Sequence, residues 1–534
     1  MIAALFITLA FPLRQEPTVP APIGRASPLP ASVSGPLAAP GVVTLELSLE
    51  RCVRTVLERN VALRLADLAN QVNATGIEQA LGAFDPELYA NASGSAREPP
   101  TASKFQSPHN QGLSSGAGLR GLYRSGLAYS LDYSLDYNRQ SPSNPFFGLN
   151  PTISSGLALN LTQPLLRNFG ATANEAPIEQ ARLLVARGNL DLYQRIQETT
   201  FRAVEAYWNL VKARRVRDTA AAALTVAEEL VGNNQKKLEV GVMTRLDVLT
   251  AQAEAARRKE ALIRAGNAAG QAEDDLKSLL SPGIDLADWR VAITPTTAAA
   301  LLQEALPDEE VAVLEAFADR ADLRAIEVDL AAARLDLEVA ANRSLPQLDL
   351  TGSYGYSGLS GKQAGGATKN NLDLWGESVA AIRDRDARQW SFGFAFSRPL
   401  GNRAADAAER RAALQLESTY MGWVDRRMAV VLDLRGALRN VADAYAATDA
   451  AMQARVLAEQ QYQAERIRLD NDHSTTFQVR EAQRDLFEAQ DRETAAITQY
   501  EILVAGLERA RGRLAQHYGV AWEPDGRLEG ELRD

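Results

Sequence analysis

Two stretches of the chain alternate apolar and polar residues and then change to a helical pattern. At residues 153–161, isoleucine and leucine occupy one side of a predicted strand and small or polar residues occupy the other. Pro164 ends this strand, because proline has no N–H to donate to a neighbouring strand. Residues 390–396 repeat the pattern with tryptophan and phenylalanine, and Pro399 follows. The chain therefore contains the same strand-to-helix junction twice.

Long helical patterns follow both junctions. Over residues 176–239, apolar residues recur at steps of three and four, which predicts a helix of about 95 Å. The chain then reverses, because Gly241 can adopt the left-handed conformation and Thr244 can cap a helix that returns over residues 245–280. By the same criteria the second half contains a helix over residues 403–469, a turn over 470–474 and a helix over 475–517.

The second half of the chain repeats the first. At one constant offset, Leu323 takes the place of Leu63 and Pro346 takes the place of Pro86, which indicates an internal duplication. In the first half, a single helix over residues 49–81 precedes the proline and an alternating strand follows it. The resulting division is a signal-like leader and Pro/Ala-rich linker over residues 1–42, structural repeats over 43–305 and 306–520, and a C-terminal tail over 521–534.

The clearest strand pattern lies at residues 127–137, where leucine and tyrosine alternate with serine and aspartate. A segment of about ten residues with one apolar, aromatic face is typical of a transmembrane β-barrel, and an antiparallel sheet packed on helices is the alternative. Just before it, Gly116, Gly118 and Gly121 spell G-x-G-x-x-G. Because strand-like alternation follows these glycines instead of a helix, we expect no dinucleotide site here.

Composition excludes several classes of function. The formal net charge of −10, with basic residues scattered among acidic ones, argues against nucleic-acid binding. One cysteine and three widely spaced histidines offer no metal site or redox pair, so we expect no metal, no cofactor and no enzyme activity. The apolar run at residues 2–11 has the length of a secretory signal, which predicts export.

Four motifs carry a resemblance to a known family. They are LTQPLLRNFG at residues 161–170, RPLGNR at 398–403, VGVMTRLDVLTAQ at 240–252 and STTFQVREAQRDL at 474–486. In this order and spacing the chain resembles the TolC-like outer membrane efflux protein family, also called outer membrane factors. The resemblance implies a mixed fold: long α-helical hairpins forming a trimeric α-barrel, topped by a 12-stranded transmembrane β-barrel with four strands per protomer.

The resemblance also implies a function and partners. The chain would be the outer membrane channel of a tripartite efflux or type I secretion system, a passive conduit from the periplasm of a Gram-negative-type bacterium to the exterior. Its partners would be two further copies of itself, a periplasmic membrane fusion adaptor, an inner membrane pump or ABC exporter, and outer membrane lipid, without nucleic acid. The alternative is a periplasmic coiled-coil scaffold without a pore.

Two sets of site residues are carried over from the family. The two helical turns would form the periplasmic tip that contacts the adaptor, through Val240, Gly241, Val242, Thr244, Ser474 and Thr475. The second turn departs from the family pattern, because Asp472 and His473 stand where a glycine-containing turn is usual. In the family, acidic residues near the tip narrow the pore, and the matching positions here are Asp247, Gln478 and Glu481. Gln478 stands where the family has an acid, and Arg480 could pair with Glu481.

Overall fold

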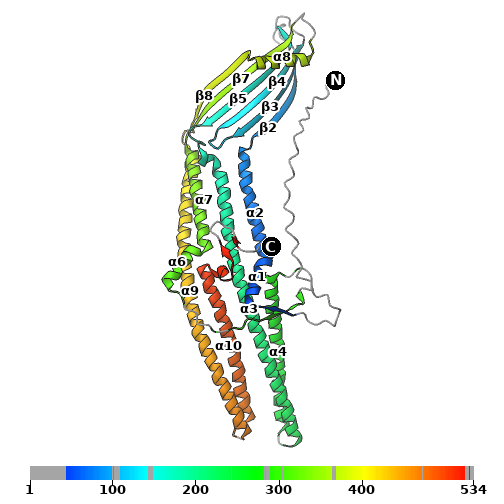
Figure 1. Cartoon of the computed structure of the whole chain (residues 1–534), viewed down its shortest axis with the longest axis vertical. Helices are drawn as coiled ribbons and strands as arrows, with labels where there is room; N and C mark the ends of the chain where they lie inside the picture. The colour runs from blue at the N-terminus through cyan, green and yellow to red at the C-terminus, as the bar shows by residue number, and fades with distance from the viewer. Residues whose placement is uncertain are drawn as a thin grey trace.

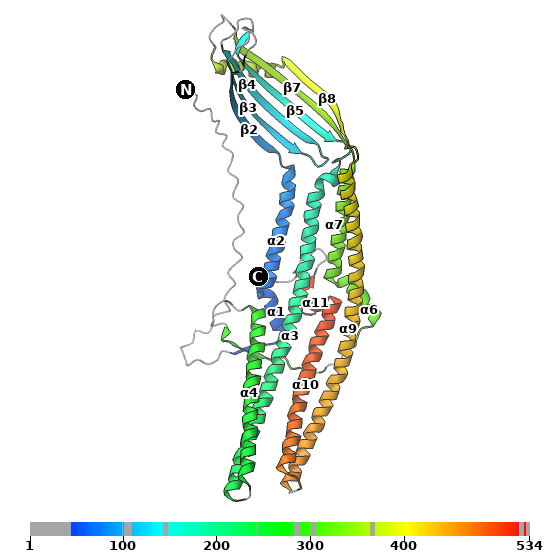
Figure 2. The same cartoon turned by 180° about the vertical axis from the view of Figure 1, so that it is seen from behind.

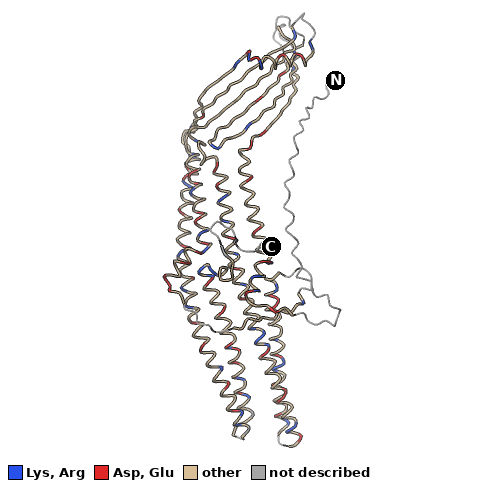
Figure 3. Tube along the Cα trace, viewed as in Figure 1, with Lys and Arg blue, Asp and Glu red and all other residues tan. Residues whose placement is uncertain are grey.

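The molecule is long, with a β-sheet at one end and helical hairpins extending from it (Figure 1). A computed structural model describes residues 44–98, 100, 109–141, 148–241, 243–281, 283, 289–299, 301, 306–363, 369–471, 473–522 and 528–529. The leader and linker therefore lie outside the described residues. Charged residues are sparse along the sheet and frequent along the helices (Figure 3).

The predicted helices and strands occur in the predicted order in both halves, together with further elements. The helices are α1 (Leu49–Arg59), α2 (Val61–Leu81), α3 (Ala171–Glu239), α4 (Arg245–Leu280), α6 (Glu309–Asp319), α7 (Ala321–Ser344), α8 (Asn371–Asp384), α9 (Arg403–Asp470), α10 (Thr476–Arg511) and α11 (Leu514–His517). The strands are β1 (Thr44–Leu47), β2 (Glu87–Arg97), β3 (His109–Leu122), β4 (Ala128–Ser141), β5 (Leu149–Pro164), β6 (Ala292–Pro295), β7 (Gln347–Gln363), β8 (Ala387–Ser397), β9 (Ala521–Trp522) and β10 (Leu528–Glu529).

The main sheet is antiparallel, with the order β2-β3-β4-β5-β7-β8. Within the described residues it has six strands, so the expectation of four strands per protomer is wrong. The difference is the hairpin of β3 and β4, which joins the sheet between β2 and β5 (Figure 1). Its strand β3 carries glycine at four positions, which hides the alternation of side chains that identifies a strand.

The glycines of the G-x-G-x-x-G motif lie inside β3 and serve packing. A Cβ atom added at Gly118 would lie 2.8 Å from both an Asp132 carboxylate oxygen and the carbonyl oxygen of Leu131. At Gly116 it would lie 2.8 Å from the side chain of Asn91. The motif therefore allows polar side chains of neighbouring strands to cross β3, and no helix follows it to bind a pyrophosphate.

The two faces of the sheet differ in character. One row across all six strands consists of Leu88, Leu119, Leu131, Leu159, Tyr354 and Trp390, and we call its side the apolar face. The adjacent row consists of Tyr89, Gly118, Asp132, Ala158, Gly355 and Gln389, and we call its side the polar face. On the polar face, Asp132 accepts hydrogen bonds of 2.7 Å from both Ser130 and Asn160.

Helix α8, which the sequence reading missed, covers part of the apolar face at the end of the sheet farthest from the helical hairpins (Figure 1). Its Ser378 hydroxyl lies 2.5 Å from that of Ser155, and its Trp375 indole N–H donates to the Tyr133 hydroxyl at 2.8 Å. Beyond the helix the apolar face is open, and Trp390 and Phe392 are 70% and 64% exposed. An open apolar face of this kind needs a non-aqueous partner.

The long helices match their predicted bounds with three corrections. Helix α3 has 69 residues and begins at Ala171, so Pro177 lies inside it instead of near its start. The first predicted helix is two helices, because Asn60 has an extended ψ of 119° and its side chain caps α2. The last one ends at Arg511, because Gly512 adopts a φ of +81° and starts a new turn. Within the described part of the chain, none of the helices is both long enough and apolar enough to cross a bilayer.

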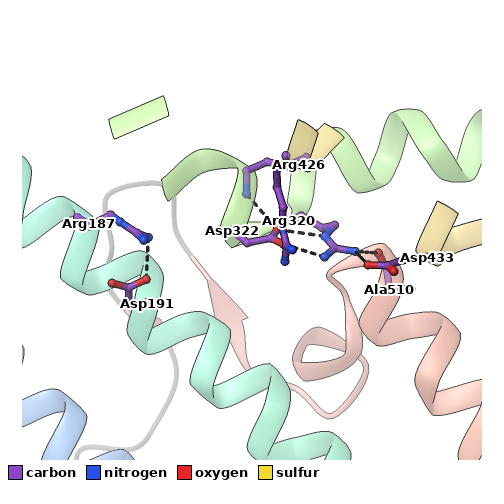
Figure 4. Close-up of polar contacts among 8 residues, drawn as sticks. Arg187, Asp191, Arg320, Asp322, Arg426, Asp433 and Ala510 are labelled. Atoms are coloured by element: carbon purple, nitrogen blue, oxygen red, sulfur yellow. Dashed lines mark hydrogen bonds and ion pairs between the residues drawn. The ribbon is translucent and has the colours of Figure 1, made fainter. Parts of the chain in front are cut away.

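A charged cluster ties the start of α7 to its neighbours (Figure 4). Arg320 donates two hydrogen bonds to Asp322, at 2.7 and 3.0 Å, and a third to the carbonyl oxygen of Ala510 in α10 at 3.2 Å. Arg426 of α9 donates to the same carboxylate at 2.8 Å. Burial acts to raise the pKa of Asp322, but the hydrogen bonds and charges of Arg320 and Arg426 outweigh it and lower that pKa.

We expect Asp322→Ala to destabilise the protein by about 3 kcal/mol, because it leaves the buried guanidinium of Arg320 without its carboxylate. Thermal unfolding followed by circular dichroism measures the loss. The control is Asp218→Ala, which removes a surface ion pair and should cost less than about 1 kcal/mol. Since the folded pKa of Asp322 is lowered, its contribution is present at neutral pH and is lost below about pH 4. Equal losses in both variants would contradict the assignment.

Candidate functional site

The two turns that join the long helices lie together at the end of the molecule opposite the sheet (Figures 1 and 2). The first turn joins α3 to α4 and the second joins α9 to α10. The two returning helices have 36 residues each, so the two hairpins reach the same level. The duplication therefore places two related turns side by side.

The first turn reverses the chain as predicted. The Gly241 N–H donates to the carbonyl oxygen of Leu238 at 3.0 Å, and Gly241 has a φ of +80°, a conformation that disfavours residues with a Cβ atom. Val240 caps the end of α3 and its side chain is 72% exposed. Val242 lies outside the described residues, so its part in the site stays a prediction.

Thr244 begins α4 with a capping box. Its hydroxyl accepts a hydrogen bond from the Asp247 N–H at 3.3 Å, and the Asp247 carboxylate accepts one from the Thr244 N–H at 3.0 Å. The same carboxylate accepts the Thr244 hydroxyl proton at 2.6 Å. These side-chain and backbone hydrogen bonds from Thr244 lower the pKa of Asp247. The structure therefore gives Asp247 a role in holding the turn.

The second turn uses the same cap with different chemistry. The Thr475 hydroxyl accepts from the Gln478 N–H, and the Gln478 side chain accepts from the Thr475 N–H, both at 3.3 Å. The Ser474 hydroxyl donates to Glu465 at 2.6 Å. The His473 N–H donates to the carbonyl oxygen of Arg468 at 2.8 Å, so this turn closes without glycine among its described residues. Asp472 lies outside them.

Glu481 pairs with a different residue from the one expected. Its carboxylate accepts a hydrogen bond from Arg484, three residues further along α10. Arg480, the expected partner, instead lies with its guanidinium 5.2 Å from the ring centre of Phe477. The hydrogen bond that Arg484 donates to Asp485 and the negative charge of Glu481 raise the pKa of Arg484, so this arginine stays charged at every relevant pH.

Two exposed apolar residues near the tip were not predicted. Leu246 is 71% exposed and Phe477 is 60% exposed. Each stands two residues after the threonine that caps its helix, so they occupy equivalent positions in the two repeats. This equivalence was the signal available in the sequence. Exposed apolar side chains at matching positions indicate a contact surface.

A groove runs between the two hairpins above the turns. Its lining includes Ala227 and Arg258 from the first hairpin and Tyr462, Arg484 and Phe487 from the second. Among the residues that the structure describes, no group of three histidine, cysteine or acidic side chains could hold a metal ion. The tip is therefore a surface of turns, caps, exposed apolar side chains and paired charges.

Sequence comparison links the chain to one family. The family model described as "Outer membrane efflux protein" matches residues 118–281 and 313–513, which is more than half of the chain. No curated protein gives a sequence match.

Three solved structures share the fold. The outer-membrane channel OprN is similar with a TM-score of 0.62 and 18% identity, over 87% of this chain and 89% of that chain. The CmeC outer membrane channel of Campylobacter jejuni gives 0.62 and 16%, over 87% and 86%. The open state of the MtrE outer membrane channel of Neisseria gonorrhoeae gives 0.56 and 18%, over 87% and 88%.

The two caps predict different responses to acid. Because the folded pKa of Asp247 is lowered, its contribution to the first turn is lost as the pH falls below about 4. Gln478 does not titrate, so the second cap serves as a control within the same chain. Amide hydrogen exchange, corrected for intrinsic rates, should show loss of protection at residues 244–247 on acidification and less change at residues 475–478. Equal changes in both turns, or an unaltered response in Asp247→Asn, would contradict this.

Proposed function

Because the chain belongs to the outer membrane efflux protein family, we propose that three copies form an outer membrane channel that carries cargo passively from the periplasm to the exterior. The observation that carries this proposal is one sheet with an open apolar face and a polar face, joined directly to two helical hairpins. A chain in water would bury that apolar face. Lipid outside and water inside account for both faces together.

The length of the hairpins supports a conduit across the periplasm. Helices α3 and α9 have 69 and 68 residues, which gives each a span of about 100 Å. Each is paired with a shorter returning helix near the tip. A single copy cannot enclose a channel with these elements, because its sheet has two open edges. Three copies arranged around an axis would enclose one.

A periplasmic scaffold without a pore fits these observations less well. The aromatic residues of β8, from Trp390 to Phe396, are between 63% and 70% exposed. Facing water, such a row would favour aggregation, whereas facing lipid it is stable. The family is one of channels and not a class of enzymes, which supports transport without catalysis.

The partners in this proposal are a periplasmic adaptor and an inner membrane pump or exporter. The adaptor would contact the tip through Val240, Gly241, Thr244, Ser474 and Thr475, with Val242 included as a prediction. The exposed side chains of Leu246 and Phe477 add apolar area to this surface. The groove between the hairpins offers a second contact for a helical partner.

Gly241→Val tests adaptor docking. Valine is strained at a φ of +80°, so the variant deforms the first turn without touching the sheet. In cells that carry the matching adaptor and pump, we expect the loss of efflux-dependent drug tolerance, while the native oligomer persists on gels. Gly241→Asn is the control, because asparagine tolerates this conformation and should keep most of the tolerance. Full drug tolerance in the valine variant would show that the first turn is not part of the docking surface.

A narrowing of the pore near the tip is the second site in the proposal. Asp247 and Gln478 would line it through their positions in the caps, and Glu481 would supply its main negative charge. Three copies of Glu481 close to one axis would attract cations. Arg484 offsets part of this charge, because it pairs with Glu481 within each copy.

Glu481→Gln should therefore weaken cation selectivity. The measurement is the reversal potential of single channels in planar bilayers under a salt gradient. Glu488→Gln is the matched control, since it removes an acid two helical turns farther from the tip on the same helix. If the reversal potential changes only in Glu488→Gln, the cation filter does not lie at Glu481. If the reversal potential is unchanged in both variants, neither residue forms a filter.

A further inference from the structure

The two edge strands of the sheet have equal length and run in opposite directions. Strands β2 and β8 have 11 residues each, and each pairs with one neighbour within the described residues. Strand β2 leaves the helical part of the molecule and β8 returns to it, so Glu87 and Ser397 lie at the same end of the sheet (Figure 2). The two edge strands are therefore antiparallel, and β8 of one copy can pair side by side with β2 of another over the full length of both strands.

Full-length pairing of β8 with β2 keeps the apolar faces of the two copies on the same side. Within one sheet, the apolar row that starts at Leu88 ends at Trp390. If Ser397 lies opposite Glu87 of the next copy, Trp390 lies opposite Gly94, six residues beyond Leu88. Six is an even number, so the apolar side chains of both copies stay on one side. An odd displacement would turn one sheet's apolar face into the channel.

The same displacement gives an acceptable barrel. Three copies with six strands each contain eighteen strands. The shear number is the displacement in residues summed once around the barrel, and three displacements of six residues make it equal to the number of strands. A barrel with equal strand number and shear has a strand tilt of about 36°. Transmembrane barrels have tilts of about 35–45°. Both edge strands also have the length of about 9–11 residues that crosses the hydrocarbon core of an outer membrane.

Side-chain sizes match across the proposed junction. On the apolar face β2 presents mainly small residues, and in this register the opposite pairs are Ala90 with Phe394, Ala92 with Phe392, and Gly94 with Trp390. Large aromatic rings opposite alanine and glycine can pack over the neighbouring backbone. On the polar face, Ser391 lies opposite Ser93.

We propose that three copies close an eighteen-stranded barrel, in which β8 of each copy pairs with β2 of the next with Phe392 opposite Ala92. This inference rests on the trimeric channel proposed above and adds its strand number and register. Barrel diameter grows roughly linearly with strand number, so the exit would be about half as wide again as that of a twelve-stranded barrel. The extra width comes from the hairpin of β3 and β4.

Pairs of cysteines test the register in the full-length protein in outer membranes. Ser93→Cys with Ser391→Cys places thiols on the polar face, and Ala92→Cys with Phe392→Cys does so on the apolar face. Adjacent cross-strand pairs alternate in hydrogen bonding, so at least one of the two has suitable disulfide geometry. The native Cys52 is fully buried and its thiol pKa is raised to about 12, so it does not compete. Oxidation should give covalent trimers on non-reducing gels.

Two control pairs separate the alternatives. Asn91→Cys with Ser391→Cys shifts the register by two residues and should give about tenfold less covalent trimer, because the Cα atoms then exceed disulfide range. Ser134→Cys with Ser391→Cys reports closure at β4, which would make a twelve-stranded barrel. A better yield from either control overturns the inference. A native trimer with no disulfide from any pair also overturns it but leaves the trimeric channel standing, whereas a monomer contradicts both.

Discussion

The molecule depends on one constraint, which is that backbone N–H and C=O groups in lipid must find partners within protein. Inside the sheet, the backbone N–H and C=O groups of neighbouring strands pair with one another. Among the strands that the structure describes, the outer edges of β2 and β8 have no neighbour in this sheet. A chain with this sheet is incomplete as a single copy. In the proposed channel, the association of copies and the enclosed water-filled path both follow from closing those edges. The helical hairpins then extend the enclosed path away from the membrane.

The duplication explains why the two halves share their supports. Each half has a helix that leads into the sheet, a strand that returns from it, and a long hairpin with a threonine cap. A charged cluster lies within the second half. The Asp322 carboxylate joins α7 to α9 through Arg426, and Arg320 extends the same cluster to α10. This buried cluster holds α7, α9 and α10 of the second half together.

Sequence reasoning found the helical part of the fold because its signals are local. Gly241 and the threonine caps mark the turns by chain stereochemistry alone, and the bounds of α4 agree with the prediction. It left open whether residues 113–139 form barrel strands or a loop, because glycines such as Gly118 remove side chains from the alternation in β3. The space at Gly118 is taken by Asp132 and Leu131 of β4 and by Tyr89 of β2. Sequence reasoning missed α8, which is held by contacts such as that of Trp375 with Tyr133, distant in sequence. The wrong partner for Glu481 has a similar cause, since Phe477 competes for Arg480.

The most direct measurement is the behaviour of the purified protein with and without detergent. Sedimentation equilibrium in a density-matched detergent should give the mass of three copies of the exported chain, and removal of detergent should precipitate the protein. The reason is that the apolar face and the aromatic row of β8 then meet water. A single chain that stays dissolved in plain buffer would contradict the account, because its sheet would then be stable with both edges open and its apolar face wet.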